Sequence, residues 1–207
     1  MPRQNRVDPF GTIFATSAYG EWMGNRGRLH DAEKRIVRNW AGKAWIICAL
    51  DFKGRRRELM SPDSYTELFF LDEPTALAAG HRPCAECRRA AFSGFKAAFA
   101  IGQAQAGHTV KTAADMDRVL HAERTDARAD GVVAELPDGA MVELDGAAWL
   151  KFGDRLHRWT ASGYEDSRAI PPGSATVLTP PSTIAALRAG YRPVFHPSVV
   201  DTAAPQQ

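Results

Sequence analysis

The chain has 207 residues, of which 44% are hydrophobic and 24% are charged. These fractions are close to the averages of globular proteins and exclude a fibrous repeat or a wholly disordered chain. The net charge is only +2, yet residues 1–60 hold 12 Lys and Arg against 6 Asp and Glu, whereas residues 101–207 hold 10 against 13. A basic first third is the charge pattern expected of a surface that contacts phosphate.

The sequence also bears on the compartment in which the protein works. No apolar segment is long enough to span a bilayer, and the N-terminal ten residues are not followed by the apolar core of a signal peptide. Three cysteines, two of them spaced Cys-x-x-Cys, fit a reducing compartment better than a disulfide framework. We therefore expect a cytoplasmic protein without a membrane partner, and the sequence indicates no oligomeric state.

The first third predicts short strands joined by glycine-containing turns. Residues 12–16 alternate as a strand, and residues 44–52 form an apolar run bounded by glycines. Between them, residues 23–30 contain two glycines and an asparagine, which predicts a loop. Residues 53–57 are expected at the tip of a hairpin that returns through residues 58–60.

Two helices are predicted around the middle of the chain. A strand at residues 66–71 leads into a short helix, Glu73 to Ala79, with Asp72 as its N-cap and Gly80 as its C′ residue. A second, amphipathic helix is predicted from about residue 83 or 84 to residue 106.

The second half predicts a further helix at residues 113–123, a connection at residues 124–131, and a β-meander. Four short strands are separated by Pro-Asp-Gly, Asp-Gly and Gly-Asp turns, which are strong hairpin signals; they span residues 132–136, 140–144, 147–152 and 155–159. The pattern Ala-Leu-x-Ala-Gly-x-Arg-Pro of residues 76–83 recurs at residues 186–193. A second short helix ending in glycine is therefore expected, with Ser182 as its N-cap.

Together these elements predict an α+β fold. The expected organisation is a basic, mixed α/β domain at residues 1–110 that contains the Cys-x-x-Cys knuckle. Residues 111–207 are expected to form a helix, an antiparallel β-meander and a C-terminal unit with a short helix.

Cys84 and Cys87 form the knuckle, at the start of the second predicted helix. Two thiolates with this spacing can bind one ion, but tetrahedral zinc needs two more ligands. The candidates are Cys48, His30 and His81, although a free cysteine in an apolar strand is more often a core residue. Three interpretations stay open: a zinc site, a metal-free knuckle and a redox dithiol.

Residues 69–87 carry one family resemblance. They run Phe-Phe-Leu-Asp-Glu-Pro-Thr-Ala-Leu-Ala-Ala-Gly-His-Arg-Pro-Cys-Ala-Glu-Cys, and this segment resembles the second half of the metal-binding domain of Ada, the DNA methyl-phosphotriester repair protein. The resemblance implies that Cys84 and Cys87 are zinc ligands. In that family an upstream Cys-x-x-x-Cys completes the site and includes the methyl acceptor, and this chain has no such pair.

Basic residues near the knuckle suggest a partner. Arginine is suited to bidentate contact with phosphate, and the candidates for nucleic-acid binding are Lys53, Arg55, Arg56, Arg57, Arg82, Arg88 and Arg89. With the Ada resemblance, they predict a nucleic-acid-associated protein related to DNA repair, with DNA favoured over RNA. The alternative is an ordinary solvated charged face.

Two other function classes stay open. Residues 24–31 form a glycine loop that offers Asn25, Arg26, His30 and Asp31, which could position and polarise a substrate in a small-molecule or nucleotide enzyme. The chain has none of the spacings of a zinc protease, a serine hydrolase, a phosphate loop or a dinucleotide fold. The third class is a structural or partner-binding module.

Overall fold

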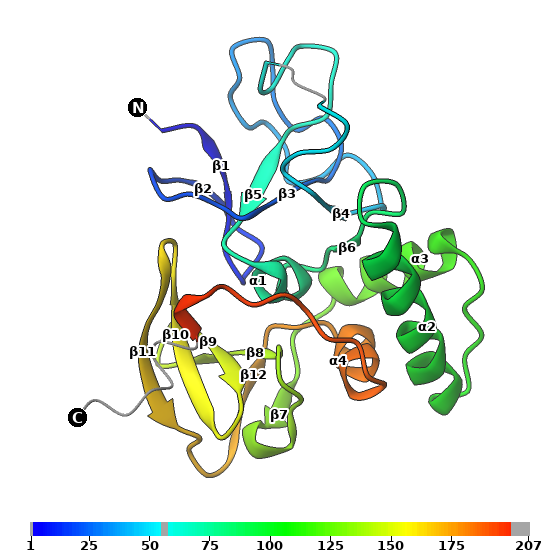
Figure 1. The fold of residues 1–207 in the computed structure, drawn as a ribbon, viewed down its shortest axis with the longest axis vertical. Helices are drawn as coiled ribbons and strands as arrows, with labels where there is room; N and C mark the ends of the chain where they lie inside the picture. Colours follow the sequence, from blue (N-terminus) through cyan, green and yellow to red (C-terminus); the bar gives the residue numbers. More distant parts are fainter. Residues whose placement is uncertain (1, 55–57, 200–207) are drawn as a thin grey trace.

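The structure is a computed structural model that describes residues 2–54 and 58–199. Within these residues it has two six-stranded sheets and four α-helices, which confirms the α+β class (Figure 1). The first sheet has the order β2-β1-β5-β3-β4-β6, with β1 (Gln4–Val7), β2 (Ile13–Ala15), β3 (Trp22–Asn25), β4 (Ile46–Cys48), β5 (Leu68–Phe70) and β6 (Arg82–Pro83). Its β1–β5 and β4–β6 pairs are parallel, and its other pairs are antiparallel.

The second sheet contains the predicted meander. Its order is β11-β10-β9-β8-β12-β7, all antiparallel, from β7 (Asp130–Val132), β8 (Met141–Leu144), β9 (Ala147–Phe152), β10 (Arg155–Thr160), β11 (Gly163–Ala169) and β12 (Ser174–Val177). Gly146 and Gly153 have φ of +73° and +60° in the predicted turns, a conformation that suits glycine. The strand predicted at residues 132–136 is wrong, because Val133–Glu135 forms a 3₁₀-helix, η1.

The helices are α1 (Glu73–Ala78), α2 (Arg89–Gln105), α3 (Ala113–Thr125) and α4 (Pro181–Arg188), with α2, α3 and α4 grouped beside the sheets (Figure 1). Asp72 caps α1 as predicted, since its carboxylate accepts hydrogen bonds from the amide and hydroxyl of Thr75. Gly80 follows with φ of +82°. Helix α2 begins later than expected, because the residues of the knuckle form turns.

The repeated Ala-Gly-x-Arg-Pro pattern produces the same helix exit twice. Gly80 and Gly190 both have positive φ, and the following amides, of His81 and Tyr191, each donate to a carbonyl five residues earlier. The predicted N-cap of the second copy is wrong, since Ser182 lies inside α4.

Two strand expectations in the first third also need correction. Residues 22–25 form β3 rather than a loop, because Gly24 allows the neighbouring strand to approach; a Cβ there would lie 2.2 Å from the Ile46 carbonyl oxygen. Residues 58–60 contain no strand, so the described part of the predicted hairpin is wrong.

The main hydrophobic cluster contains residues from both halves, among them Phe70, Phe99, Leu120 and Leu187. Helix α2 packs against α4, where Gly102 faces Ala185. The predicted boundary at residue 110 stays a prediction. None of the helices in the described residues is long and apolar enough to cross a membrane.

Candidate metal centre

The β4–β6 pair brings the three cysteines together. Cys48 ends β4, and Cys84 directly follows β6. The Cys84 amide donates to the Ile47 carbonyl at 2.9 Å, which continues the parallel ladder and places Cys84 beside the end of β4. The turn after Cys84 then returns Cys87 to the same point before α2 begins.

The three thiols form one cluster. The Sγ atoms of Cys48, Cys84 and Cys87 all lie within 4.8 Å of one another, and all three cysteines are free. In a tetrahedral zinc site with Zn–S bonds of about 2.3 Å, two thiolate sulfur atoms lie about 3.8 Å apart. The sulfur separations in this cluster are of the same order. Cys48 and Cys84 are buried and Cys87 is half-buried. This cluster can hold a metal ion.

Hydrogen bonds to the Cys84 sulfur stabilise a negative charge in the cluster. The Cys48 thiol hydrogen-bonds to Cys84 and is the main cause that lowers the pKa of Cys84 to about 5; burial acts against it, and the backbone amides of Cys87 and Glu86 support it. The Glu86 amide lies 3.4 Å from the Cys84 sulfur. The hydrogen bond that the Cys48 thiol donates to Cys84, and then burial, raise the pKa of Cys48. Burial is the main cause that raises the pKa of Cys87. One thiolate is therefore already favoured, and it lies just before the N-terminus of α2.

The two histidine candidates lie outside the cysteine cluster. His30 contacts the Thr66 hydroxyl through Nδ1 at 2.7 Å and the Ser61 carbonyl through Nε2 at 3.1 Å. His81 is buried and accepts a hydrogen bond from Arg26 through Nε2 at 3.2 Å. Both rings therefore have other partners, whereas the described residues supply Cys48 as the third thiol.

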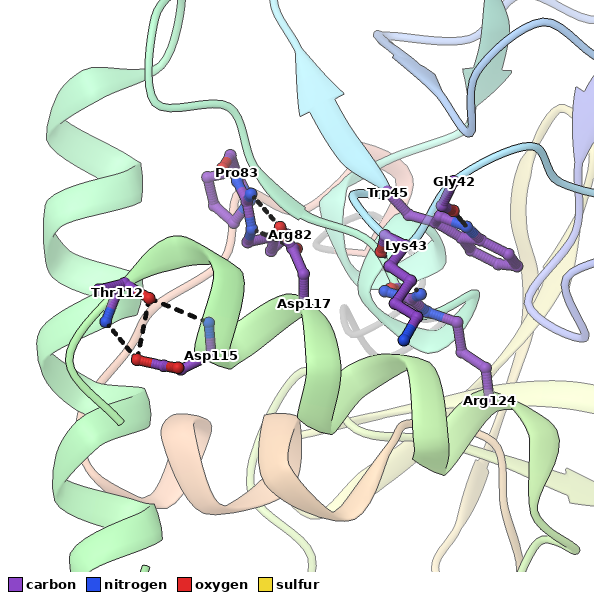
Figure 2. Close-up of polar contacts among 10 residues, drawn as sticks. Gly42, Lys43, Trp45, Arg82, Pro83, Thr112, Asp115, Asp117 and Arg124 are labelled. Atoms are coloured by element: carbon purple, nitrogen blue, oxygen red, sulfur yellow. Dashed lines mark hydrogen bonds and ion pairs between the residues drawn. The ribbon is translucent and has the colours of Figure 1, made fainter. Parts of the chain in front are cut away.

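Two of the arginines predicted to contact nucleic acid are buried in ion pairs. Arg82 makes two hydrogen bonds of 2.8 Å to Asp117 of α3 (Figure 2). Arg88 makes two of 2.9 Å to Glu73 and lies over the ring of Trp22. These guanidinium groups hold the fold together and are not available to phosphate, which corrects their sequence-based assignment.

The remaining basic candidates divide into two groups. Lys53 and Arg89 are exposed, and they follow Cys48 and Cys87 by five and two residues. The predictions for Arg55, Arg56 and Arg57 fall outside the described residues.

The glycine loop does not gather its four candidate catalytic residues. Asn25 accepts from the Gly27 amide. The Arg35 amide donates to the Asp31 carboxylate and is the main cause that lowers the pKa of that group, and the ion pair with the Arg35 side chain adds to the effect. Of these four residues, only Arg26 lines a cavity of about 950 Å³ that lies against the ends of α3 and α4. The four side chains therefore do not line this cavity together, and a catalytic role for Asn25, Arg26, His30 and Asp31 stays a prediction.

Comparison with known proteins gives no further support: no protein-family model, curated protein or solved structure matches this chain. The resemblance to Ada thus rests on residues 69–87 alone.

Proposed function

We propose that this chain is a zinc-binding protein with Cys48, Cys84 and Cys87 as its protein ligands. The observation that carries the proposal is the convergence of the three thiols within 4.8 Å. Cysteine thiolates are soft ligands that favour zinc, copper(I) or iron–sulfur clusters over magnesium and calcium. Zinc agrees best with the Cys-x-x-Cys spacing and with amide groups that donate to sulfur.

The proposed ion would connect two parts of the fold. Cys48 belongs to the first sheet, and the other two ligands precede α2, so zinc would fix the start of this helix against the end of β4. Among residues 2–54 and 58–199, no histidine, cysteine, aspartate or glutamate joins the three thiols as a fourth ligand. A fourth position is thus left for water or for a ligand from outside the cluster.

Metal analysis by mass spectrometry tests the proposal. Wild-type protein purified without chelators is expected to carry about one zinc per chain, and Cys48→Ser, Cys84→Ser and Cys87→Ser to carry much less. Ala85→Ser is the matched control, since this exposed residue lies in the same turn and the change leaves all three thiols in place. Chelation should lower the melting temperature of wild type and of the control. A zinc-free wild type whose melting temperature does not respond to added zinc would refute the site.

A second candidate function, association with DNA, is favoured by two exposed cations. Lys53 and Arg89 follow Cys48 and Cys87 in the sequence by five and two residues, and each could neutralise one phosphate. The basic first third of the sequence and the resemblance to Ada support the same partner class. We propose DNA rather than RNA as the partner on this basis.

Salt-dependent binding tests the DNA proposal. Fluorescence anisotropy with a labelled duplex should show weaker binding by the double variant Lys53→Gln/Arg89→Gln. The slope of log affinity against log salt should fall in magnitude by about two. Arg158→Gln, in β10, is the control, because it removes a half-exposed cation remote in sequence from the cluster. Equal affinities and slopes in all three proteins would exclude a role for Lys53 and Arg89.

A further inference from the structure

A cavity of about 950 Å³ lies between the first sheet, the second sheet and the ends of two helices. Its wall includes the turn between β1 and β2, the segment before β4, the C-terminal end of α3 and the start of α4. No cysteine lines it, so it is separate from the candidate metal centre. Two of its arginines, Arg26 and Arg124, define its chemistry.

Arg26 is buried in the cavity wall and makes no direct ion pair with any residue that the structure describes. Only 1% of its surface is exposed. Nε donates to His81 at 3.2 Å and Nη1 donates to the Gly11 carbonyl at 3.0 Å, while Nη2 has no partner among the described residues. Since a guanidinium only donates hydrogen bonds, His81 accepts through Nε2 and is neutral. The Nη2 group of Arg26, with its two N–H donors, is thus left over.

Arg124 repeats this pattern from the end of α3. It donates through Nε to the Gly80 carbonyl at 2.9 Å and through Nη1 to the Lys43 carbonyl at 3.1 Å. Its Nη2 is also buried without a partner in the described part of the chain. Figure 2 shows Arg124 reaching from α3 toward Lys43 and Trp45. Carbonyl groups orient this guanidinium, but they do not neutralise it.

Trp45 holds the two cations near each other. The guanidinium carbons of Arg26 and Arg124 lie 4.0 and 4.2 Å from the centre of its ring system. In residues 2–54 and 58–199, neither arginine has a carboxylate within 4.0 Å. Burial is the main cause that lowers the pKa of Arg26 to about 9 and of Arg124 to about 10, and their mutual repulsion contributes at Arg26. Both remain charged at neutral pH.

Two buried cations that make no direct ion pair are unfavourable, and a bound anion would stabilise them. Three carboxylates act on the pair from beyond ion-pair distance, since the charge of Asp8 raises the pKa of Arg26 and the charges of Asp117 and Glu123 raise that of Arg124. Asp117 already accepts two hydrogen bonds from Arg82, and Glu123 accepts from the amide and hydroxyl of Ser182. Asp126 and Asp130 are exposed residues of the wall. In the described residues, no carboxylate accepts a hydrogen bond from Nη2 of Arg26 or Arg124, so both groups are left for an external anion.

The cavity also offers aromatic surface beside the cations. Trp40 and His121 line it and pack edge to face, with ring centres 4.8 Å apart. Trp40 is 45% exposed, an unusual position for tryptophan that leaves ring surface free for contact. Phe10 adds a third ring to the wall.

We propose that this cavity binds a small organic oxyanion, a phosphate or carboxylate attached to a planar ring. The oxyanion would accept hydrogen bonds from the free Nη2 groups of Arg26 and Arg124, which suits the preference of guanidinium for such groups. The ring would contact Trp40. The proposal does not depend on zinc or on DNA binding.

Isothermal titration calorimetry with three anionic probes and one neutral control tests the proposal and separates the possible ligands. Adenosine monophosphate and benzoate combine an oxyanion with a planar ring, and inorganic phosphate is the oxyanion alone. Saturable binding at millimolar concentration or tighter is expected for at least one ring-bearing probe, and adenosine, which lacks the anion, should not bind. Tighter binding of the nucleotide identifies phosphate as the preferred anion, and tighter binding of benzoate identifies carboxylate. Absence of binding by both ring-bearing probes would overturn the proposal.

Matched variants show whether the arginine pair is responsible. Arg124→Gln should weaken binding at least tenfold, whereas Arg118→Gln, on the same helix but exposed and paired with Asp115, should bind like wild type. Arg26→Met is a second test, in which thermal unfolding confirms that the variant is folded, and it should also bind more weakly than wild type. Wild-type affinity in Arg124→Gln would overturn the assignment, and so would equal weakening in Arg118→Gln.

Discussion

The strongest prediction concerns the buried pair of Arg88 and Glu73. The fully buried Glu73 carboxylate accepts two hydrogen bonds from Arg88, one from the Tyr191 hydroxyl and one from the Val194 amide. Arg88→Met removes two of these four hydrogen bonds and also the cation that pairs with Glu73. The methionine keeps an apolar contact with Trp22. Breaking a buried ion pair at one partner costs about 3–5 kcal/mol. For a chain of this size, the melting temperature should fall by roughly 6–20 °C.

Thermal unfolding followed by circular dichroism measures this fall. Arg89→Met is the matched control, because the adjacent arginine is exposed and its loss should change stability by about 0.5 kcal/mol or less. The double variant Glu73→Gln/Arg88→Met should recover part of the loss, since it leaves no buried charge. Equal melting temperatures for Arg88→Met and Arg89→Met would refute the reasoning.

Two further predictions concern helix packing and pH. Gly102→Ala should lower the free energy of unfolding by about 1–3 kcal/mol, because its Cβ would lie 2.7 Å from the Ala185 Cβ; Gly94→Ala, with no neighbour within 4 Å, should raise it by about 0.5–1 kcal/mol. Burial and the charges of two arginines lower the pKa of His81 well below its usual 6.5. Folded His81 therefore stays neutral while the unfolded histidine takes up a proton below about pH 6.5, so stability falls as pH falls and His81→Gln should reduce this fall.

Urea unfolding tests the glycine pair, and melting curves between about pH 5 and 8 test His81. A Gly102→Ala protein as stable as wild type would contradict the close packing of α2 on α4. For His81, parallel pH profiles of wild type and His81→Gln would show that this histidine does not cause the acid sensitivity.

Much of the fold could be predicted where the signal is local. The cap at Asp72, the glycine exit at Gly80 and the turns around Gly146 and Gly153 depend on residues a few positions apart. Their backbone conformations follow from side-chain chemistry that the sequence displays directly. Strand β3 was missed because Gly24 is typical of a loop, and the reason for glycine there lies in a different strand.

The candidate site was only half predictable for the same reason. The spacing of Cys84 and Cys87 indicates a shared ligand, but the place of Cys48 depends on the parallel pairing of β4 with β6, which local patterns do not reveal. A cysteine at the end of a buried strand was the only available signal. Likewise, Arg82 and Arg88 look like surface cations until the fold brings Asp117 and Glu73 to them.

The contacts of Glu73 also have a consequence for synthesis of the protein. Its partners Tyr191 and Val194 lie 118 and 121 residues further along the chain. A ribosome releases the chain from its N-terminus, so the carboxylate of Glu73 emerges long before these two donors. The hydrogen bonds of Glu73 at the start of α1 therefore stay incomplete until residue 194 has been made. Nascent chains that stall before residue 191 should therefore be more sensitive to proteases than the finished protein.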